Sequence, residues 1–490
     1  MKITSLTIAG FKGIEKKATI PLAPITLLFG ANSTGKSTVL QALLYLYEII
    51  FDRNFDPQYS TITGEQLWLG GFHNLVHGKN LANTITIGAT LDFRDGNEDV
   101  WDDYLTGTES FLLINSFGFW PEVTADVMSF ELDLAWDQFN QRVFVSRFEC
   151  SSKAHCYIKF EAQEGKRSSS ITHFSPLSHW HIPEPFEDLD LFNPALWEGL
   201  YFPYQDALPP IESRIDMSAN NIDWESEYPE FSLEASLFAA AALSQASLAP
   251  LKILSRKLQN ILHIGPLRIV PGRETFLEAK PKTSRWYDGT AGWDHFAFGS
   301  DGYREQINHC FNHVDLLNSS YHFKASFQGE APLQQRQVQL TEANANTPLR
   351  PCDVGVGVSQ AFPFIAATCL EQSGVMVSCE QPELHIHPRW QLSLADMMLA
   401  ACRKDPQRMF LVETHSEHLM LRLLKRRRQS AEGEITDNHS SYCRKEDIQI
   451  IFCEQEKGKT RLLPIKTTDE GEFDAPWPNG FFAERREELF

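Results

Sequence analysis

The chain has 490 residues, of which 42% are hydrophobic, and a formal net charge of −20 at pH 7. This length exceeds one ordinary hydrophobic core, so we expect two or three packed units, and one domain can interrupt another. The acidic balance argues against indiscriminate coating of nucleic acid, because such binding depends on neutralising phosphates with Lys and Arg. Any contact with nucleic acid must therefore be local.

The composition also bears on the cellular compartment. The nine cysteines contain no C-x-x-C pair, and Cys150 and Cys156 lack the spacing of a zinc site, which favours a reduced protein with free thiols. Residues 1–8 have the pattern of a strand rather than of a signal peptide. The apolar tract Phe238–Leu243 is too short to span a bilayer. We therefore expect a cytoplasmic protein without a membrane contact.

The most specific motif is a complete G-x-x-x-x-G-K-[ST] phosphate-binding loop. The run Ile25–Phe29 before it predicts a buried strand and Val39–Leu46 after it predicts a helix, which is the context the motif requires. We expect the loop amides to bind phosphates, Lys36 to reach the terminal phosphates, and Ser37 to offer its hydroxyl to Mg²⁺. The predicted nucleotide-binding residues are Gly30, Asn32, Ser33, Thr34, Gly35, Lys36, Ser37 and Thr38.

Two further strands, Lys2–Ile8 and Ala18–Ile20, are predicted ahead of the loop strand, with Phe11–Gly13 in the turn between them. This order resembles the ATPase heads of the ABC/SMC superclass, in particular the RecF, RecN and OLD-nuclease branch. The resemblance implies ATP and Mg²⁺ as cofactors. It also places a sensor loop after the first helix, where His73 or His77 could replace the usual glutamine, although a structural role is the alternative.

The pattern weakens from about residue 95 to residue 250, where Trp, Phe, Pro and acids cluster without a catalytic motif. Recurring prolines and the absence of a sustained heptad argue for an inserted, loop-rich module instead of a long coiled coil. We predict three parts: 1–94, the N-terminal part of the ATPase head; 95–250, the insertion module; and 251–490, the C-terminal part of the head. The predicted fold class is α/β, an ABC/SMC-like P-loop ATPase head with an inserted α+β module.

A glycine-rich turn before residue 361 predicts a second anion-binding helix start. Gly357, Ser359 and Gln360 occupy the place of the ABC signature motif but depart from its usual L-S-G-G-Q sequence. A plain helix cap is the alternative. Upstream, a Gly-Pro-x-Arg turn contains Arg268, with Arg273 close behind. The resemblance places both arginines near the nucleotide interface, and a solvated surface turn is the alternative.

The run Val375–Glu380 predicts a Walker B strand, whose terminal Glu380 can hold Mg²⁺ together with Ser37. The next position, usually the glutamate that polarises water, is Gln381, which cannot act as a general base; either Glu383 takes that role or turnover is slow. A later strand ends near His415, which matches the switch histidine of the superclass. The basic stretch Lys425–Arg428 is a candidate contact for phosphate or an acidic partner, or a complement to its helix dipole.

By resemblance, two copies should sandwich two ATP molecules, with the loop of one copy facing the Ser359 turn of the other. OLD-type relatives carry a nuclease domain after the ATPase, but only about seventy residues follow His415 here, too few for such a domain. Any nuclease effector must then be a separate protein. The W-P-x-G-F-F ending, Trp477–Phe482, resembles one subgroup of these ATPases, and the leading hypothesis is an ATPase subunit of a bacterial anti-phage system. A RecF-like DNA-repair loading ATPase and a slowly hydrolysing, nucleotide-locked scaffold are the alternatives.

Overall fold

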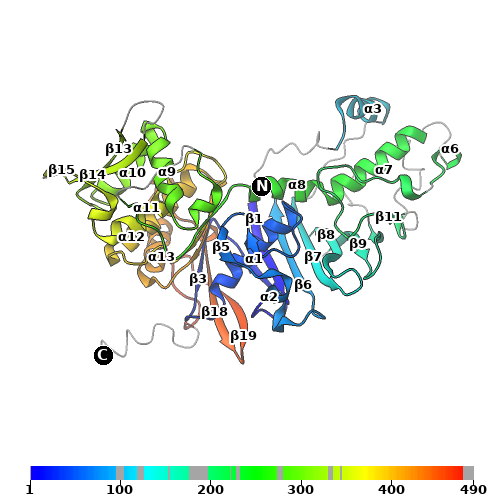
Figure 1. The fold of residues 1–490 in the computed structure, drawn as a ribbon, viewed down its shortest axis with the longest axis horizontal. Helices are drawn as coiled ribbons and strands as arrows, with labels where there is room; N and C mark the ends of the chain where they lie inside the picture. The colour runs from blue at the N-terminus through cyan, green and yellow to red at the C-terminus, as the bar shows by residue number, and fades with distance from the viewer. Residues whose placement is uncertain are drawn as a thin grey trace. The chain divides into compact units, whose positions relative to one another are not determined.

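The computed structural model describes the following parts of the chain: 2–94, 104–117, 126–152, 155–175, 197–220, 222–227, 232–272, 280–328, 335–342 and 345–477. Two compact units are assembled from alternating stretches of sequence. The first unit comprises Met1–Thr19, Tyr45–Gln58 and Gly70–Gln259, and the second comprises Ile20–Leu44, Tyr59–Leu69 and Asn260–Phe490 (Figure 1). The three predicted parts, divided at residues 94 and 250, describe a different division of the chain and remain a prediction.

The first unit is built on an eight-stranded sheet with the order β11-β10-β9-β8-β7-β6-β1-β2. The strands are β1 (Lys2–Ala9), β2 (Ala18–Pro21), β6 (Ile85–Asp92), β7 (Val127–Asp137), β8 (Arg142–Ser152), β9 (His155–Ala162), β10 (Ser169–Phe174) and β11 (Tyr201–Phe202). From β11 to β1 neighbouring strands are antiparallel. Strands β7 to β10 fall inside the predicted insertion and extend the sheet that β1 and β6 begin. The predicted mixed α/β class is confirmed.

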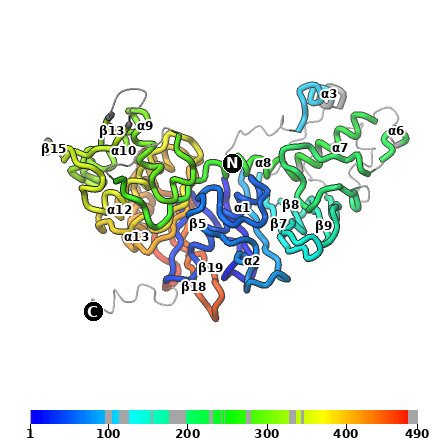
Figure 2. Tube along the Cα trace, in the orientation of Figure 1, coloured from blue at the N-terminus to red at the C-terminus, as the bar shows by residue number. Residues whose placement is uncertain are grey.

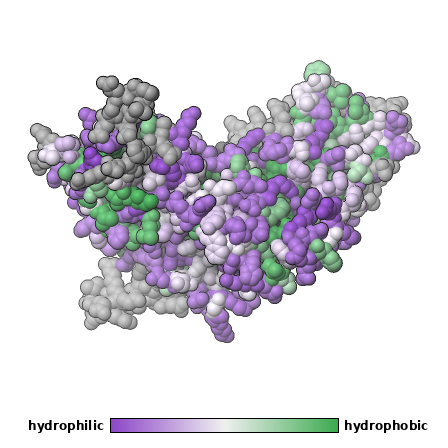
Figure 3. All heavy atoms as spheres, in the orientation of Figure 1, coloured by the Kyte–Doolittle hydropathy of each residue, from purple (hydrophilic) through white to green (hydrophobic). Residues whose placement is uncertain are grey.

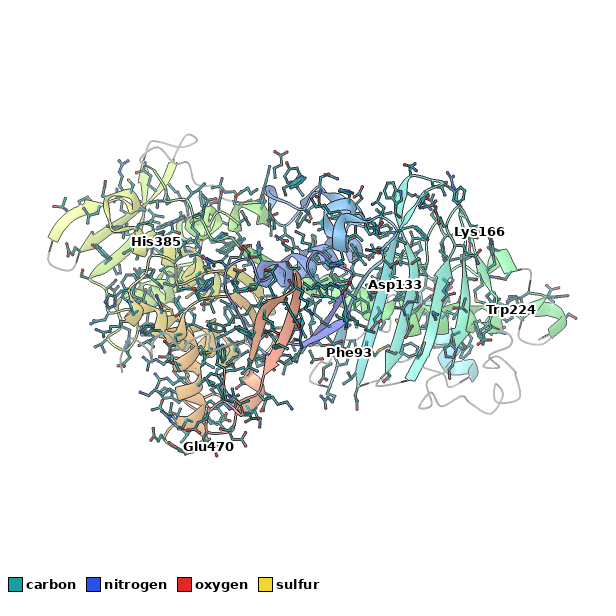
Figure 4. The ribbon with its side chains drawn as sticks, turned by 90° about the horizontal axis from the view of Figure 1, so that it is seen from below. Phe93, Asp133, Lys166, Trp224, His385 and Glu470 are labelled. Atoms are coloured by element: carbon teal, nitrogen blue, oxygen red, sulfur yellow. The ribbon has the colours of Figure 1, made fainter. Side chains whose placement is uncertain are left out.

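Alternating residues explain the long strands of this sheet. In β7 every second side chain is buried along most of its length, the period-two pattern of a strand with one face on a core. On the other face, Asp133 accepts a hydrogen bond of 2.6 Å from Nε of Arg147 in β8. Figure 4 labels Asp133, which lies in this sheet. The core face contains Phe148 stacked on Phe160. The helical segments of this unit are α2 (Gly71–Leu75), η1 (His77–Lys79), α3 (Gly107–Phe117), η4 (Ser218–Asn220), α6 (Trp224–Glu227), α7 (Ser232–Ser247) and α8 (Ala249–Leu258).

The second unit contains a six-stranded sheet with the order β12-β16-β17-β3-β18-β19. The strands are β3 (Ile25–Phe29), β12 (Ile261–Ile264), β16 (Met376–Glu380), β17 (Met409–Glu413), β18 (Ile448–Glu456) and β19 (Lys459–Ile465). The first five strands run parallel and β19 returns antiparallel to β18. The blue strand β3 lies beside the orange strand β18 in Figure 1, and the same blue and orange segments adjoin in Figure 2, so chain segments distant in sequence share one sheet.

Helices and two small sheets complete the second unit. The helical segments are α1 (Lys36–Ile50), which continues into the first unit, η5 (Thr283–Trp286), α9 (Thr290–Phe298), α10 (Asp301–Asn312), η6 (Pro351–Asp353), α11 (Val356–Thr368), α12 (Pro388–Lys404), α13 (Glu417–Ala431) and η7 (Lys445–Asp447). The small sheets pair β4 (Tyr59–Ser60) with β5 (Gly64–Trp68), and β13 (Tyr321–Gln328) with β14 (Gln335–Glu342) and β15 (Ala345–Leu349). In the core, Trp293 stacks on Phe362 with ring centroids 3.8 Å apart.

Parallel strands place their carboxyl ends at one edge of the sheet, and this edge positions the candidate site. The phosphate-binding loop follows β3, Glu380 ends β16, and Glu413 ends β17. All five residues of β3 are buried, as predicted for a strand covered on both faces. Surface side chains on the face in Figure 3 are mostly hydrophilic where the structure describes them. By length and apolar composition, no single described helix could cross a membrane, although the bent pair Ser232–Gln245 and Ala249–Leu258 meets both criteria together.

Candidate nucleotide-binding site

The loop between β3 and α1 has a backbone that requires glycine at two positions. Gly30 has φ +151° and Gly35 has φ +98°, both in the region that side chains disfavour. A Cβ on Gly30 would lie 2.3 Å from the carbonyl oxygen of Cys453, and one on Gly35 would lie 2.5 Å from Oγ1 of Thr460. Residues of β18 and β19 therefore pack directly against the loop, and side chains at positions 30 and 35 would clash with them.

Lys36, the first residue of α1, lies against the loop that precedes it. Its Nζ donates to the carbonyl oxygens of Gly30 at 3.0 Å and Ala31 at 2.8 Å, and only 4% of the residue is exposed. Burial lowers the pKa of Lys36, and the nearby carboxylate of Glu413, 3.8 Å away, opposes that shift. The ammonium group is thus positioned in the concave side of the loop, where a phosphate chain would lie.

One of two neighbouring strand-end carboxylates bonds to the P-loop hydroxyl. Glu380 and Glu413 are register partners at the ends of adjacent strands, and Leu28 of β3 pairs with Glu413 on the other side. Ser37 Oγ donates to Oε2 of Glu413 at 2.6 Å. Burial raises the pKa of Glu413, the Ser37 bond opposes this, and the neighbouring charge of Glu380 raises it further. The predicted pair Ser37 and Glu380 is therefore joined by a third residue, Glu413, which sequence analysis had not selected.

These oxygens fit the ligand chemistry of Mg²⁺, which prefers hydroxyl and carboxylate donors. Within the described residues, no group of three or more His, Cys, Asp or Glu side chains could hold a metal ion by itself. Ser37, Glu380 and Glu413 would therefore hold Mg²⁺ together with phosphate oxygens and water, as is usual for this ion. Glu380 also lies 3.3 Å from Nε2 of the fully buried His263, whose Nδ1 lies 2.9 Å from Ser378 Oγ.

Glu383, the candidate base, and His415, the predicted switch histidine, are in direct contact. Oε1 of Glu383 accepts a hydrogen bond of 2.7 Å from the backbone amide of His415. Burial raises the pKa of the Glu383 carboxyl, and the hydrogen bond from His415 opposes that shift. Burial lowers the pKa of His415, and the charge of Lys36 adds to this. Among the residues that the structure describes, the buried Nε2 of His415 has no hydrogen-bond partner, so it is available to a ligand.

Gln381 has a left-handed backbone, with φ +45°, and its amide donates to the carbonyl oxygen of Glu413 at 2.8 Å. The predicted residues Glu380, Gln381, Glu383 and His415 thus lie on two neighbouring strand-end turns beside the P-loop. Their catalytic roles remain predictions.

The signature-like turn directs its side chains into its own unit. Ser359 is fully buried and donates from Oγ to the carbonyl oxygen of Pro351 at 3.0 Å. Gln360 donates from Nε2 to the carbonyl oxygen of Arg268 at 2.6 Å. A Cβ on Gly357 would lie 2.7 Å from the carbonyl oxygen of His385. Nucleotide contacts by Gly357, Ser359 and Gln360 stay predictions, and in this structure the two side chains have internal partners.

The remaining predicted residues do not belong to the P-loop and strand-end turns described above. His73 and His77 belong to the first unit, where His73 is exposed and His77 Nδ1 lies 2.7 Å from the carbonyl oxygen of Lys12. Arg268 is 4% exposed, so the solvated-turn alternative is wrong for this residue. Arg273 and the C-terminal residues 478–490 lie outside the described residues. Trp477 packs edge-on against Phe29 of β3, at 5.9 Å between ring centroids.

Several arginines in and near the basic stretch of α13 bond to side chains of the same unit. Arg426 donates from Nε and Nη2 to the two carboxylate oxygens of Asp396 at 2.6 and 3.0 Å, and Arg422 lies 3.4 Å from the same carboxylate. Arg427 is 2% exposed and its Nη1 donates to Thr467 Oγ1. Arg422, Arg426 and Arg427 therefore have partners within their own unit, whereas Lys425 and Arg428 are exposed. A role of this stretch in contact with phosphate or an acidic partner stays a prediction.

Comparison with known proteins finds a similar family over the first part of the chain. Residues 1–169 match the family model described as an AAA ATPase domain. No curated protein matches the chain. Among solved structures, the SMC head domain from Thermotoga maritima aligns with 9% identity and a TM-score of 0.38, covering 95% of this chain and 100% of that one. An Smc head domain bound to the C-terminal domain of ScpA, derived from Pyrococcus furiosus, aligns with 9% identity and a TM-score of 0.37, covering 100% and 98%.

The AAA match includes the P-loop and its flanking strand and helix. Over residues 1–169 the chain is therefore similar to AAA ATPase domains, in agreement with the predicted P-loop ATPase class.

Proposed function

We propose that this chain binds ATP with Mg²⁺ at the loop Gly30–Thr38 and hydrolyses it. The observation that carries the proposal is the convergence of Lys36, Ser37, Glu380 and Glu413 at the carboxyl edge of one parallel sheet. This arrangement brings a buried cation for the terminal phosphates beside a hydroxyl and two carboxylates for the metal, the combination that phosphoryl transfer needs.

On binding nucleotide, Lys36 exchanges its two backbone carbonyl partners for phosphate oxygens. The metal supplies charge neutralisation of the phosphates. The amide side chain of Gln381 orients the attacking water, and Glu383 accepts its proton. A buried carboxylate with a raised pKa is a stronger base than a solvated one, which suits Glu383 to this role. His415, neutral because its pKa is lowered, offers Nε2 to the γ-phosphate or the water.

For the assembly, we propose an ATP-sandwiched homodimer or higher oligomer in the cytoplasm that controls a separate effector, such as a nuclease, in bacterial anti-phage defence. Support comes from the sequence resemblance to OLD-type ATPases. Gln381, at the usual position of the catalytic glutamate, favours a slowly hydrolysing, nucleotide-locked scaffold as a second candidate. A RecF-like loading ATPase is the third, and it predicts ATP-dependent binding of duplex DNA by the isolated protein.

Mass measurement of the Glu383→Gln variant with ATP, with ADP and without nucleotide tests the assembly. The variant should bind ATP, fail to release phosphate and accumulate as a dimer only with ATP, because a loss confined to transition-state chemistry leaves binding intact. A monomer under all three conditions would contradict the sandwich. Phage challenge of cells carrying this gene and its neighbours, with Lys36→Ala as the comparison, then tests the role in defence.

A further inference from the structure

Arg268 is a buried cation that bonds to the backbone of two separate segments. It follows β12 in the turn Gly265–Arg268. Its Nη1 donates to the carbonyl oxygen of Gln360 in α11 at 3.2 Å. Its Nη2 donates to the carbonyl oxygens of Glu380 at 2.6 Å and Gln381 at 3.1 Å. The guanidinium thus joins the start of α11 to the turn that follows the Walker B strand.

The contact is reciprocal and depends on the shape of arginine. Gln360 returns a hydrogen bond from Nε2 to the carbonyl oxygen of Arg268 at 2.6 Å, and both side chains are almost fully buried. A guanidinium carries five donors in a rigid plane, whereas the ammonium of lysine is a single point with a different reach. Lysine at this position could not bond to all three carbonyl oxygens in the same geometry.

The turn that Arg268 contacts has an unfavourable backbone. Gln381 adopts φ +45°, a conformation that residues other than glycine, asparagine and aspartate rarely adopt. Three hydrogen bonds involve its backbone: its amide donates to the carbonyl oxygen of Glu413, and its own carbonyl oxygen accepts from Arg268 and from the amide of Leu384. The bond from Leu384 lies within the turn, so without the bond from Arg268 the turn is free to relax toward negative φ, which would move Gln381 and Glu383 away from the P-loop.

We propose that Arg268 is a positioning residue that holds the Gln381–Glu383 turn in its left-handed conformation and couples this turn to the start of α11. The effect on turnover rests on the proposed ATPase function, but the effect on the turn itself does not. Toward the site, Arg268 donates to the backbone carbonyl oxygens of Glu380 and Gln381 and to Sγ of Cys379 at 3.5 Å, so we assign it a positioning role and not that of a nucleotide ligand.

The chain offers a matched control in Arg408. This arginine is equally buried at 4% exposure and also donates to three carbonyl oxygens, those of Thr368, Leu370 and Gln372, at 2.5, 2.7 and 2.8 Å. It lies at the start of β17, at the opposite end of that strand from Glu413. Arg408→Lys should therefore cost comparable stability without reaching the Gln381 turn.

Hydrogen exchange of the nucleotide-free protein tests the structural part of the proposal. Arg268→Lys should speed exchange of the amides of Gln381, Leu384 and Ile386 by about 10-fold or more, while β17 stays protected. Arg408→Lys should leave these three amides unchanged. Unchanged exchange at the turn in Arg268→Lys, or an equal increase in Arg408→Lys, would overturn the proposal.

A double-mutant cycle tests the functional part. Asparagine accepts positive φ more readily than glutamine, so Gln381→Asn should lessen the dependence of the turn on Arg268. Arg268→Lys should lower the rate of phosphate release on the order of 10- to 100-fold in the wild-type background, with KM for ATP little changed, and clearly less in the Gln381→Asn background. Equal fold-losses in both backgrounds would contradict the coupling. If wild type itself lacks Lys36-dependent turnover, the proposed function fails, and the exchange measurement still decides the role of Arg268.

Discussion

Ser37 and Glu413 are 376 residues apart in the chain, yet Oγ of the serine donates a hydrogen bond of 2.6 Å to Oε2 of the glutamate. The bond ties the P-loop to the end of β17, the strand between β3 and the Walker B strand β16. It also adds Glu413 to Glu380 as a carboxylate that would hold Mg²⁺. The next two predictions separate these acids.

Glu413→Gln should reduce Mg²⁺-dependent phosphate release on the order of 100-fold, because it removes a charge next to both Ser37 and Lys36. The fold should persist, since the replaced side chain is isosteric and burial already raises the pKa of this acid. Steady-state phosphate release at saturating ATP measures the effect. Glu432→Gln, at the exposed end of α13, is the control and should behave as wild type. Equal rates of phosphate release in Glu413→Gln and Glu432→Gln would show that Glu413 does not take part in the site.

Glu380→Gln should shift the Mg²⁺ concentration for half-maximal turnover upward, because a metal-bound carboxylate is lost. The melting temperature should change little. Magnesium titrations of Glu380→Gln and Glu413→Gln, run side by side, show which acid binds the ion more closely. A collapse of the melting temperature with an unchanged magnesium requirement would identify Glu380 as a structural acid.

Glu383→Gln should raise stability in a pH-dependent manner. Burial raises the folded-state pKa of Glu383, so the folded protein binds more protons than the unfolded chain between the two pKa values. The contribution of Glu383 to stability is therefore fully present below its unfolded pKa of about 4.3 and is lost as pH rises through the folded-state pKa. Glutamine avoids this loss.

Melting temperatures without nucleotide, taken across this pH range, check the prediction. The advantage of Glu383→Gln over wild type should grow with pH and then level off. A difference that is constant with pH would mean that the carboxyl does not titrate in the folded protein as its burial implies.

Asp396→Ala should destabilise the second unit by about 3 kcal/mol, because it leaves Arg422 and Arg426 without the carboxylate between them. Asp396 is 4% exposed, so the loss is little screened by solvent. Denaturant unfolding measures the change, and Lys425→Ala, at an exposed position of the same helix, serves as the control. A loss of unfolding free energy below about 1 kcal/mol, the usual range for surface ion pairs, would instead mean that the arginines of α13 are available for contact with phosphate or an acidic partner.

Much of the fold around the P-loop was predictable because local sequence patterns determine it. The predicted strands at Ile25–Phe29 and Val375–Glu380 correspond to β3 and β16, and the predicted helix after the P-loop corresponds to α1. The extent of the large antiparallel sheet was not predicted. Its strands β7 to β10 lie between two stretches, before β7 and after β10, in which Trp, Pro and acids cluster, and these stretches obscured the period-two signal of the strands.

Glu413 could have been selected from sequence, since it ends an apolar run, Met409–Val412, in the same way that Glu380 ends Met376–Cys379. Two acidic strand ends on neighbouring parallel strands must lie close together. The roles of Arg268 and Gln360 could not, because their partners are backbone carbonyl oxygens, which every residue carries and no sequence pattern marks.

Phosphate release at saturating ATP and Mg²⁺ by wild type, Lys36→Ala, Glu383→Gln and Gln381→Glu tests the central claim most directly. We predict slow but measurable turnover in wild type, none in Lys36→Ala or Glu383→Gln, and faster turnover in Gln381→Glu, which restores a carboxylate facing the attacking water. Equal, substantial rates in all four proteins would show that the hydrolysis is not performed at this P-loop and would contradict the account.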